Sequence, residues 1–180
     1  MQCTPGVKPA GGVDNGRMLR DKNLIPLSHQ HQHALAMCVR LDRALAKGNV
    51  DLNAWQEEIV GIWESEIRYH FEAEEKILFP AADRYASLQP LVEQLLSEHV
   101  ALRDFFARAG ARSLDAATLK TFVETLAQHI RTEERQLFEE CQRQMPAEEM
   151  ARAGAAMDDY FAHSGMPGAS CALPSASRKQ

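Results

Sequence analysis

Residues 69–80 read YHFEAEEKILFP and residues 129–138 read HIRTEERQLF. In both stretches a histidine is followed four residues later by a glutamate, which gives the pairs His70–Glu74 and His129–Glu133. Four residues rotate an α-helix by about 400° and advance it by about 6 Å, so each pair projects from one helix face. Apolar residues flank both pairs, which argues against exposed i,i+4 ion pairs and predicts that these side chains face the interior.

The sequence around these stretches has helical periodicity, and no segment alternates in the manner of a β-strand. Four long helices are predicted at about residues 24–47, 52–79, 87–110 and 115–145. Gly48 with Asn49 ends the first helix, Asp51 caps the second, and Pro80 is expected to interrupt the second. A weaker fifth helix is predicted over residues 147–161, so the expected fold class is all-α.

Each of the four long helices carries a histidine within its apolar seam; these are His31, His70, His99 and His129. Glu66 lies one turn before His70 and is also expected in the seam. Short connections force each helix back beside its predecessor. The predicted fold is therefore an antiparallel up-down-up-down four-helix bundle with a short extra C-terminal helix. That topology places the four histidines around one axis.

The composition indicates one domain with two tails. Residues 1–23 and 164–180 are rich in Gly, Ser, Pro and Ala and are expected to be flexible, which leaves residues 24–163 as the bundle domain. The N-terminus lacks the apolar core of a signal peptide, and no run could span a bilayer, so a cytoplasmic location away from membranes is expected. A net charge of −5 without a Lys/Arg-dense stripe argues against nucleic acid as a partner.

The seam histidines and glutamates predict a metal site. Buried imidazoles and carboxylates are costly unless hydrogen bonds or a cation compensate them. Nitrogen and carboxylate ligands suit iron, manganese or zinc, and six such residues fit two metal ions bridged by two carboxylates better than one catalytic zinc. Ferritin-type bundles instead place a glutamate three residues before a histidine, a spacing that this chain lacks. The cysteines are scattered without CxxC spacing and are expected to be reduced thiols: Cys3, Cys38, Cys141 and Cys171.

Four segments of the chain resemble the hemerythrin-like, or HHE cation-binding, family in family order: LSHQHQHAL (27–35), YHFEAEEKILFP (69–80), EHVALR (98–103) and HIRTEERQLF (129–138). The resemblance covers about residues 24–145. It implies a non-haem centre of two iron ions with an oxo or hydroxo bridge. The implied assignment is His31 and His70 on one iron, His99 and His129 on the other, and Glu74 and Glu133 as bridges.

One position departs from the family pattern. Oxygen-carrying hemerythrins have a second histidine one turn after the position that His99 matches, and this chain has Arg103 there. Arginine stays protonated and cannot ligate a metal, so an open coordination position is expected at the second iron. Arg103 itself either pairs with a carboxylate near that position or extends to solvent.

Two further assignments stay open in the sequence. His29 and His33 flank His31, and they are expected to be solvated or to support the ligands, with His31 as the ligand. Glu66 is expected to accept a hydrogen bond from a ligand imidazole, with an extra ligand and a residue at the bundle mouth as the alternatives.

Four functions are compatible with this pattern. The first is a di-iron protein that binds dioxygen or a related small molecule in order to sense, buffer or scavenge it. The second is an enzyme that decomposes hydrogen peroxide or reduces nitric oxide, because an open position provides coordination space. The third is iron handling, including iron–sulfur repair, although the cysteine-bearing domain and further histidine usual in such relatives are not evident. The fourth is a helical interaction module without metal.

Overall fold

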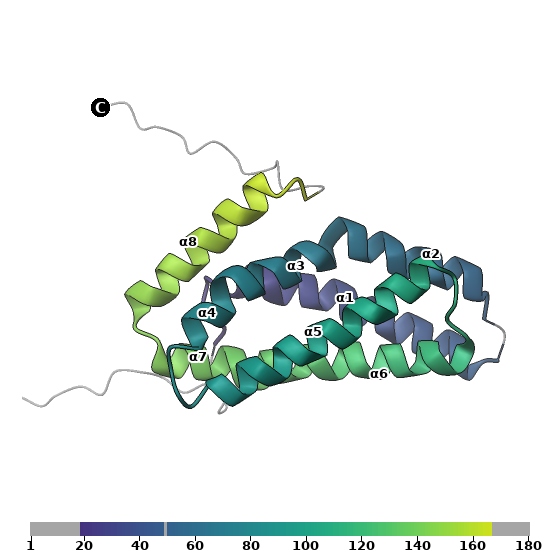
Figure 1. Ribbon diagram of the computed structural model, residues 1–180, viewed down its shortest axis with the longest axis horizontal. Helices are drawn as coiled ribbons and strands as arrows, with labels where there is room; N and C mark the ends of the chain where they lie inside the picture. Colours follow the sequence, from purple (N-terminus) through teal and green to yellow (C-terminus); the bar gives the residue numbers. More distant parts are fainter. Residues whose placement is uncertain (1–18, 49, 167–180) are drawn as a thin grey trace, which may run out of the picture.

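The computed structural model describes residues 19–48 and 50–166, and all regular secondary structure in this part of the chain is helical (Figure 1). The helices form five rods. The single ones are α1 (Ile25–Ala46), α5 (Gln89–Gly110) and α8 (Ala147–His163). The second rod combines α2 (Leu52–Ile62), α3 (Arg68–Ala73) and α4 (Phe79–Ala82) through the π-helical turns η1 (Trp63–Ile67) and η2 (Glu74–Leu78). The fourth rod combines α6 (Ala116–Thr132), the π-helical turn η3 (Glu133–Leu137) and α7 (Phe138–Gln144).

The first four rods form the predicted four-helix bundle. Helix α1 packs against α6, α6 against α5, and α5 against α2, while η1 closes the circle onto α1. Successive rods run in opposite directions along the long axis of the molecule in Figure 1. The all-α, up-down-up-down prediction is therefore confirmed.

Local sequence signals fix where these rods begin and end. Asp51 and Asp115 cap α2 and α6. The Asp51 carboxylate accepts from two backbone N–H groups of the first turn, and the Asp115 carboxylate accepts from the backbone N–H of Thr118. Gly48 follows α1 with φ of 70°, a conformation that glycine adopts without a steric penalty. Pro80 does not interrupt the second rod, which continues to Ala82. The reason is that Pro80 lies in the first turn after η2, where the missing N–H is tolerated.

The π-helical turns change which residues face the core. A π-turn holds more residues per turn than an α-helix and so shifts the buried stripe by about one position. Within η1 the buried residue is Ile67, whereas Glu66, expected in the seam, is only half-buried. At the end of η2 Leu78 is fully buried, whereas Ile77 is only half-buried. The regular 3.6-residue period used for the prediction does not apply across these turns.

Two apolar clusters fill the bundle on either side of the histidines. One cluster includes Leu27, Leu95 and Leu137, and the other includes Ala34, Leu102 and Leu126. In each of these helices the seam histidine lies between a member of the first cluster and a member of the second. The clusters therefore separate a polar layer at mid-bundle from both ends of the molecule.

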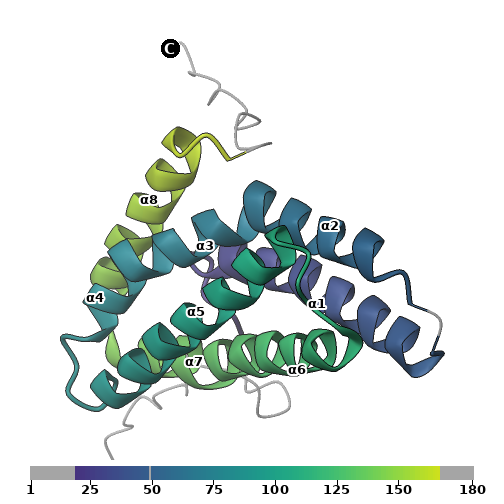
Figure 2. The same cartoon turned by 45° about the vertical axis from the view of Figure 1, so that its right-hand side comes forward.

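Helix α8 leaves the end of the bundle and packs on the outside of α3 and η2 (Figure 2). Its Gly154 lies against Asn23, where a Cβ atom would come within 2.5 Å of the Asn23 side chain. Residues 19–23, assigned to the N-terminal tail by sequence, thus contact the bundle, and Arg20 hydrogen-bonds Glu134 and Gln142. Residues 1–18 and 167–180, the remainder of the two predicted tails, lie outside the described residues.

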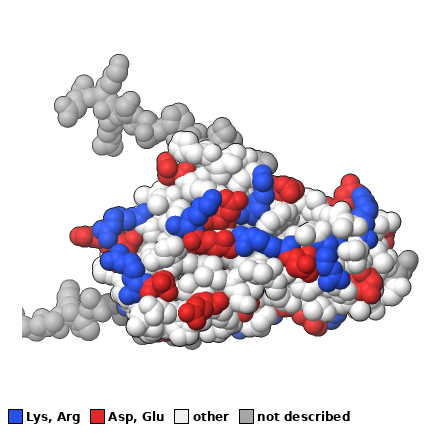
Figure 3. Space-filling view, in the orientation of Figure 1, with Lys and Arg blue, Asp and Glu red and all other residues white. Residues whose placement is uncertain are grey.

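The surface of the molecule is polar and mixed in charge (Figure 3), and two of its cysteines are buried. On the face seen in Figure 3 acidic and basic side chains are interspersed, often as neighbours. None of the described helices is long and apolar enough to cross a membrane. Cys38 and Cys141 are buried free thiols, and burial raises the pKa of each to about 12. Cys3 and Cys171 lie outside the described residues.

Candidate metal centre

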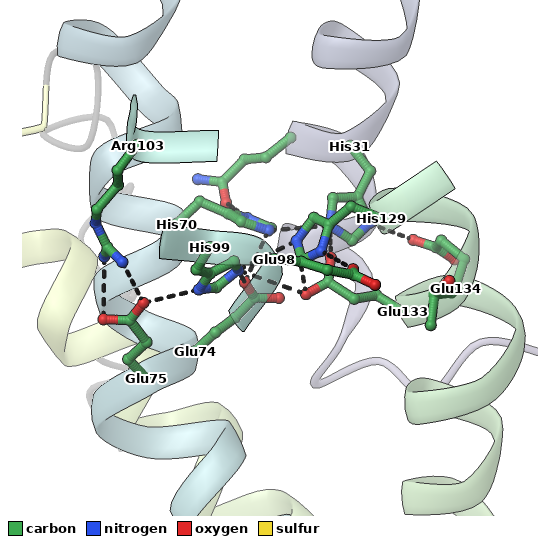
Figure 4. Close-up of polar contacts among 12 residues, drawn as sticks. His31, His70, Glu74, Glu75, Glu98, His99, Arg103, His129, Glu133 and Glu134 are labelled. Carbon is green, nitrogen blue, oxygen red and sulfur yellow. Dashed lines mark hydrogen bonds and ion pairs between the residues drawn. The ribbon is translucent and has the colours of Figure 1, made fainter. Parts of the chain in front are cut away.

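Six ionisable side chains converge in the middle of the bundle (Figure 4). Each of the first four rods contributes one histidine, and η2 and η3 each begin with a glutamate. All six side chains are nearly inaccessible, with relative exposures of 0–3%: His31, His70, Glu74, His99, His129 and Glu133. The structure therefore brings together all six residues proposed from sequence as metal ligands.

The inward atoms form two groups. His31 Nε2 lies 2.9 Å from His70 Nε2, and His99 Nε2 lies 3.1 Å from His129 Nε2. Glu133 reaches both groups, with Oε2 3.1 Å from His31 Nε2 and Oε1 3.3 Å from His129 Nε2. Glu74 Oε2 also reaches both, at 3.3 Å from His70 Nε2 and 3.5 Å from His99 Nε2. Both carboxylates thus lie between the two histidine pairs.

Every histidine uses its outer nitrogen, Nδ1, for one hydrogen bond. His31 Nδ1 donates to Glu134, His99 Nδ1 to Glu75, and His129 Nδ1 to Glu98, each at 2.8 Å. His70 Nδ1 donates to the side-chain oxygen of Gln30, also at 2.8 Å. Since all four partners are acceptors here, the neutral imidazoles carry the proton on Nδ1 and direct the Nε2 lone pair inward.

When the four imidazoles are neutral, the interior of the centre contains hydrogen-bond acceptors but no hydrogen-bond donors. The four oxygens of Glu74 and Glu133 are buried and have no hydrogen bond of suitable geometry. Facing them are four Nε2 lone pairs, so the interior of the centre consists of groups that repel one another unless a cation or proton lies among them. Two sets of these atoms lie close enough to hold a metal ion: His31, His70, Glu74 and Glu133 in one, and His99, His129 and Glu133 in the other.

A family model described as the hemerythrin HHE cation binding domain matches residues 26–141, which is more than half of the chain. The chain belongs to the hemerythrin HHE cation-binding domain family. Neither the search of curated proteins nor that of solved structures found a significant match. The cation-binding character of the family and the buried donor groups together identify this HHE domain as one whose centre can hold metal.

Without a bound cation, protons neutralise the centre of this HHE domain. Burial lowers the pKa of His31, but the carboxylates of Glu133 and Glu134 outweigh burial and raise it to about 9. Burial is likewise outweighed at His129, where Glu133 and Glu98 raise the pKa to about 10. The pKa of Glu133 is held well below its usual range, because His129 and His31 outweigh its burial.

The outer carboxylates are also held ionised. Burial would raise the pKa of Glu75, but the hydrogen bonds from His99 and Arg103 lower it to about 2. The pKa of Glu134 is lowered to about 2 in the same way, by His31 and Arg20 among others. An imidazole that donates to a charged carboxylate is a stronger ligand, so these contacts support metal binding.

Arg103, which stands where oxygen carriers of the family have a histidine, pairs with a carboxylate. Its Nη1 lies 2.6 Å from Glu75 Oε1 and its Nη2 3.0 Å from Glu75 Oε2. Of the two alternatives from sequence, pairing is the one observed. Because Glu75 accepts from His99, the guanidinium contacts the centre only through this carboxylate.

The structure differs from the sequence-based expectation at Glu66. Its carboxylate contacts the exposed ring of His33, with Oε1 3.0 Å from Nδ1, instead of a histidine of the centre. The π-turn η1 turns Glu66 toward α1 and places Ile67 in the core instead. His29 is exposed as well, so of the three neighbouring histidines only His31 is buried at the centre.

Sequence reasoning missed the four outer acceptors. Each is the direct sequence neighbour of a residue in the centre; they are Gln30, Glu75, Glu98 and Glu134. Neighbouring helix positions point about 100° apart, so a residue beside a ligand can reach the ligand of the next helix. The doubled glutamates in FEAEEK and RTEERQ were the available signal.

A small cavity adjoins the centre beside His31, His70 and His129. Its other walls are mainly apolar and include Ala34, Ile67, Phe71, Leu126 and Ile130. The cavity has a volume of about 10 Å³, which is room for about one water molecule. The centre of this HHE domain therefore borders a space for a very small molecule.

Proposed function

We propose that this HHE domain is a non-haem di-iron protein that binds dioxygen or a related small molecule. The supporting observation is the buried interior, in which four inward Nε2 atoms meet four carboxylate oxygens without hydrogen bonds. Two divalent cations would compensate these groups, with His31 and His70 on one ion and His99 and His129 on the other. Glu74 and Glu133 would bridge, since each lies near both pairs.

The donor set suits iron. Imidazole with carboxylate suits iron, manganese and zinc, whereas a closed zinc site generally has four ligands and often thiolates. The two described cysteines are buried with their pKa raised to about 12, so neither offers a thiolate. Family membership adds the expectation of iron, with an oxo or hydroxo bridge.

The cavity supports a neutral diatomic ligand. Its walls away from the histidines and Glu133 are mainly apolar, and its size limits the ligand to a few atoms. When bound, two ferrous ions can each supply one electron to such a ligand. The protein's own part is to exclude bulk water, since all six ligand side chains are buried. It also holds the Nδ1–H groups of the four histidines in hydrogen bonds to Glu75, Glu98, Glu134 and Gln30.

Metal analysis combined with anaerobic spectroscopy tests this proposal. The full chain, reconstituted anaerobically with Fe²⁺, should hold about two iron ions and change its near-ultraviolet and visible absorption on exposure to air. His70→Ala should lower the iron content, whereas the matched variant His29→Ala, at an exposed position of α1, should not. Full iron occupancy without a spectral response to air, or equal iron loss in both variants, would count against it.

A second candidate is peroxide decomposition or nitric oxide reduction. The supporting observation is that Arg103 pairs with Glu75 and offers no ligand, which leaves a coordination position for peroxide or a second nitric oxide. Arg103→His should add a ligand and reduce turnover of either substrate. Unchanged turnover would refute the role of an open position.

We rank iron handling below these two functions. We also propose that the protein is cytoplasmic and has no nucleic-acid or membrane partner.

A further inference from the structure

The outer hydrogen bonds of the centre follow an approximate two-fold pattern. His31 donates to Glu134 as His99 donates to Glu75, and an arginine holds each of these carboxylates. Arg20 Nη2 lies 2.7 Å from Glu134 Oε2, in the role that Arg103 has at Glu75. The pattern relates α1 and the second rod to α5 and the fourth rod, so the outer hydrogen bonds at the two metal positions correspond.

The pattern breaks at a single pair of positions. His129 donates to Glu98, the residue before His99, and His70 donates to Gln30, the residue before His31. One histidine of the centre thus has a neutral amide as its partner, while the other three have carboxylates. This difference in the outer acceptor lies at the position of His31 and His70.

The orientation of the Gln30 amide is fixed by a separate contact. Its Nε2 lies 3.6 Å from Met166 Sδ, a thioether that can accept but not donate. The amide nitrogen therefore faces Met166, and the amide oxygen faces the Nδ1–H of His70. Glu98, by contrast, also accepts from Gln94 at 2.7 Å, so its charge is retained beside His129.

A carboxylate and an amide support a ligand imidazole differently. A charged acceptor on Nδ1–H gives the ring partial imidazolate character and makes Nε2 a stronger donor to a cation, whereas a neutral acceptor does so less. Loss of such a partner typically weakens metal binding by about 10–100-fold.

We propose that the two metal positions are unequal, and that Gln30 makes the His31–His70 position the weaker of the two. This inference rests on the proposed metal-binding function. The position of His99 and His129 fills first, and the ion held by His31 and His70 is the more easily lost or exchanged.

Substoichiometric Co²⁺ tests the inequality directly. Crystals of the metal-free full chain soaked with one equivalent of Co²⁺ should show anomalous density mainly at His99 and His129, with a ratio of dissociation constants of about 10–100. The double variant Gln30→Glu/Glu98→Gln conserves total charge and exchanges the two acceptors, so it should reverse the preference. Met166→Leu, which keeps Gln30 but removes the thioether, is the control and should change the preference less than the double variant.

The outcomes separate this inference from the proposal on which it rests. Equal density at the two positions of the wild type, or a preference that the double variant leaves in place, overturns the role of Gln30 while metal binding stands. Absence of Co²⁺ from both positions overturns metal binding itself. The single variant Gln30→Glu gives a second measurement in solution, because it should bring two resolved Co²⁺ dissociation constants together.

Discussion

Metal binding by this domain should release about two protons at pH 7.5. Without a bound cation, Glu133 and its neighbours raise the pKa of His31 to about 9 and that of His129 to about 10, against burial, which lowers both. At pH 7.5 these rings are then about 97% and more than about 99% protonated, whereas ordinary histidines with a pKa of about 6.5 are only about 9% protonated. A cation must displace both protons before it can use the Nε2 lone pairs.

The sign of the pH dependence follows from the raised pKa values. Protons compete with the metal below the pKa of about 9 at His31 and about 10 at His129, so metal affinity falls as the pH falls. Between pH 7 and 8.5 the logarithm of the overall binding constant should rise by about 2 per pH unit. In the metal-free protein the same shifts stabilise the fold below about pH 6.5, and this stabilisation is lost as the pH rises through 9 to 10.

Calorimetry in buffers of different ionisation enthalpy measures the proton number. Fe²⁺ titrated anaerobically into the metal-free chain in phosphate and in Tris should give enthalpies whose difference corresponds to two protons or more. Glu134→Gln should lower the number, because it removes one carboxylate that raises the pKa of His31. Glu139→Gln, on α7, is the matched control. A release of about 0.2 proton, the value for two ordinary histidines at this pH, would refute the reasoning.

Three further results are expected. Phe71 is buried and stacks on the His99 ring with centroids 3.7 Å apart. Phe71→Ala should therefore lower the free energy of unfolding, measured in urea, by about 3–5 kcal/mol. A loss no larger than that caused by Phe105→Ala, at a half-buried position, would contradict this packing role. Asp115→Ala removes the acceptor for the Thr118 N–H and should cost about 1 kcal/mol; the exposed Asp158→Ala should cost less, and equal costs would argue against capping. Fe²⁺ at about 100 times its dissociation constant should stabilise the fold by about 2.7 kcal/mol per ion, or about 5–10 °C in Tm; a Tm that a chelator leaves unchanged would exclude tight binding to the folded state.

The helices and the ligand set could be predicted because they depend on local patterns. Asp51 and Asp115 are capping residues by chemistry, and Gly48 ends a helix by its conformational freedom. His70 and Glu74 share a face before η2 widens the helix, so the four-residue spacing was valid there. Family order among the four motifs supplied the rest of the fold.

What the sequence did not predict depends on register and on distant contacts. Glu66 does not face the core, because a π-turn shifts the stripe and no simple residue signal marks such a turn. Arg20 was assigned to a tail, since its contact with Glu134 joins residues 114 positions apart. The partner of each outer imidazole nitrogen lies on a neighbouring rod, and only the packed bundle specifies that geometry.

Both ends of the described chain reach the same half of the centre. Arg20 holds the partner of His31, and Met166 holds the partner of His70, whereas the support of His99 comes from Arg103 within the bundle. Truncations that remove Arg20 or Met166 would therefore act first on the metal position of His31 and His70. Their effect on that position should exceed their effect on the position of His99 and His129.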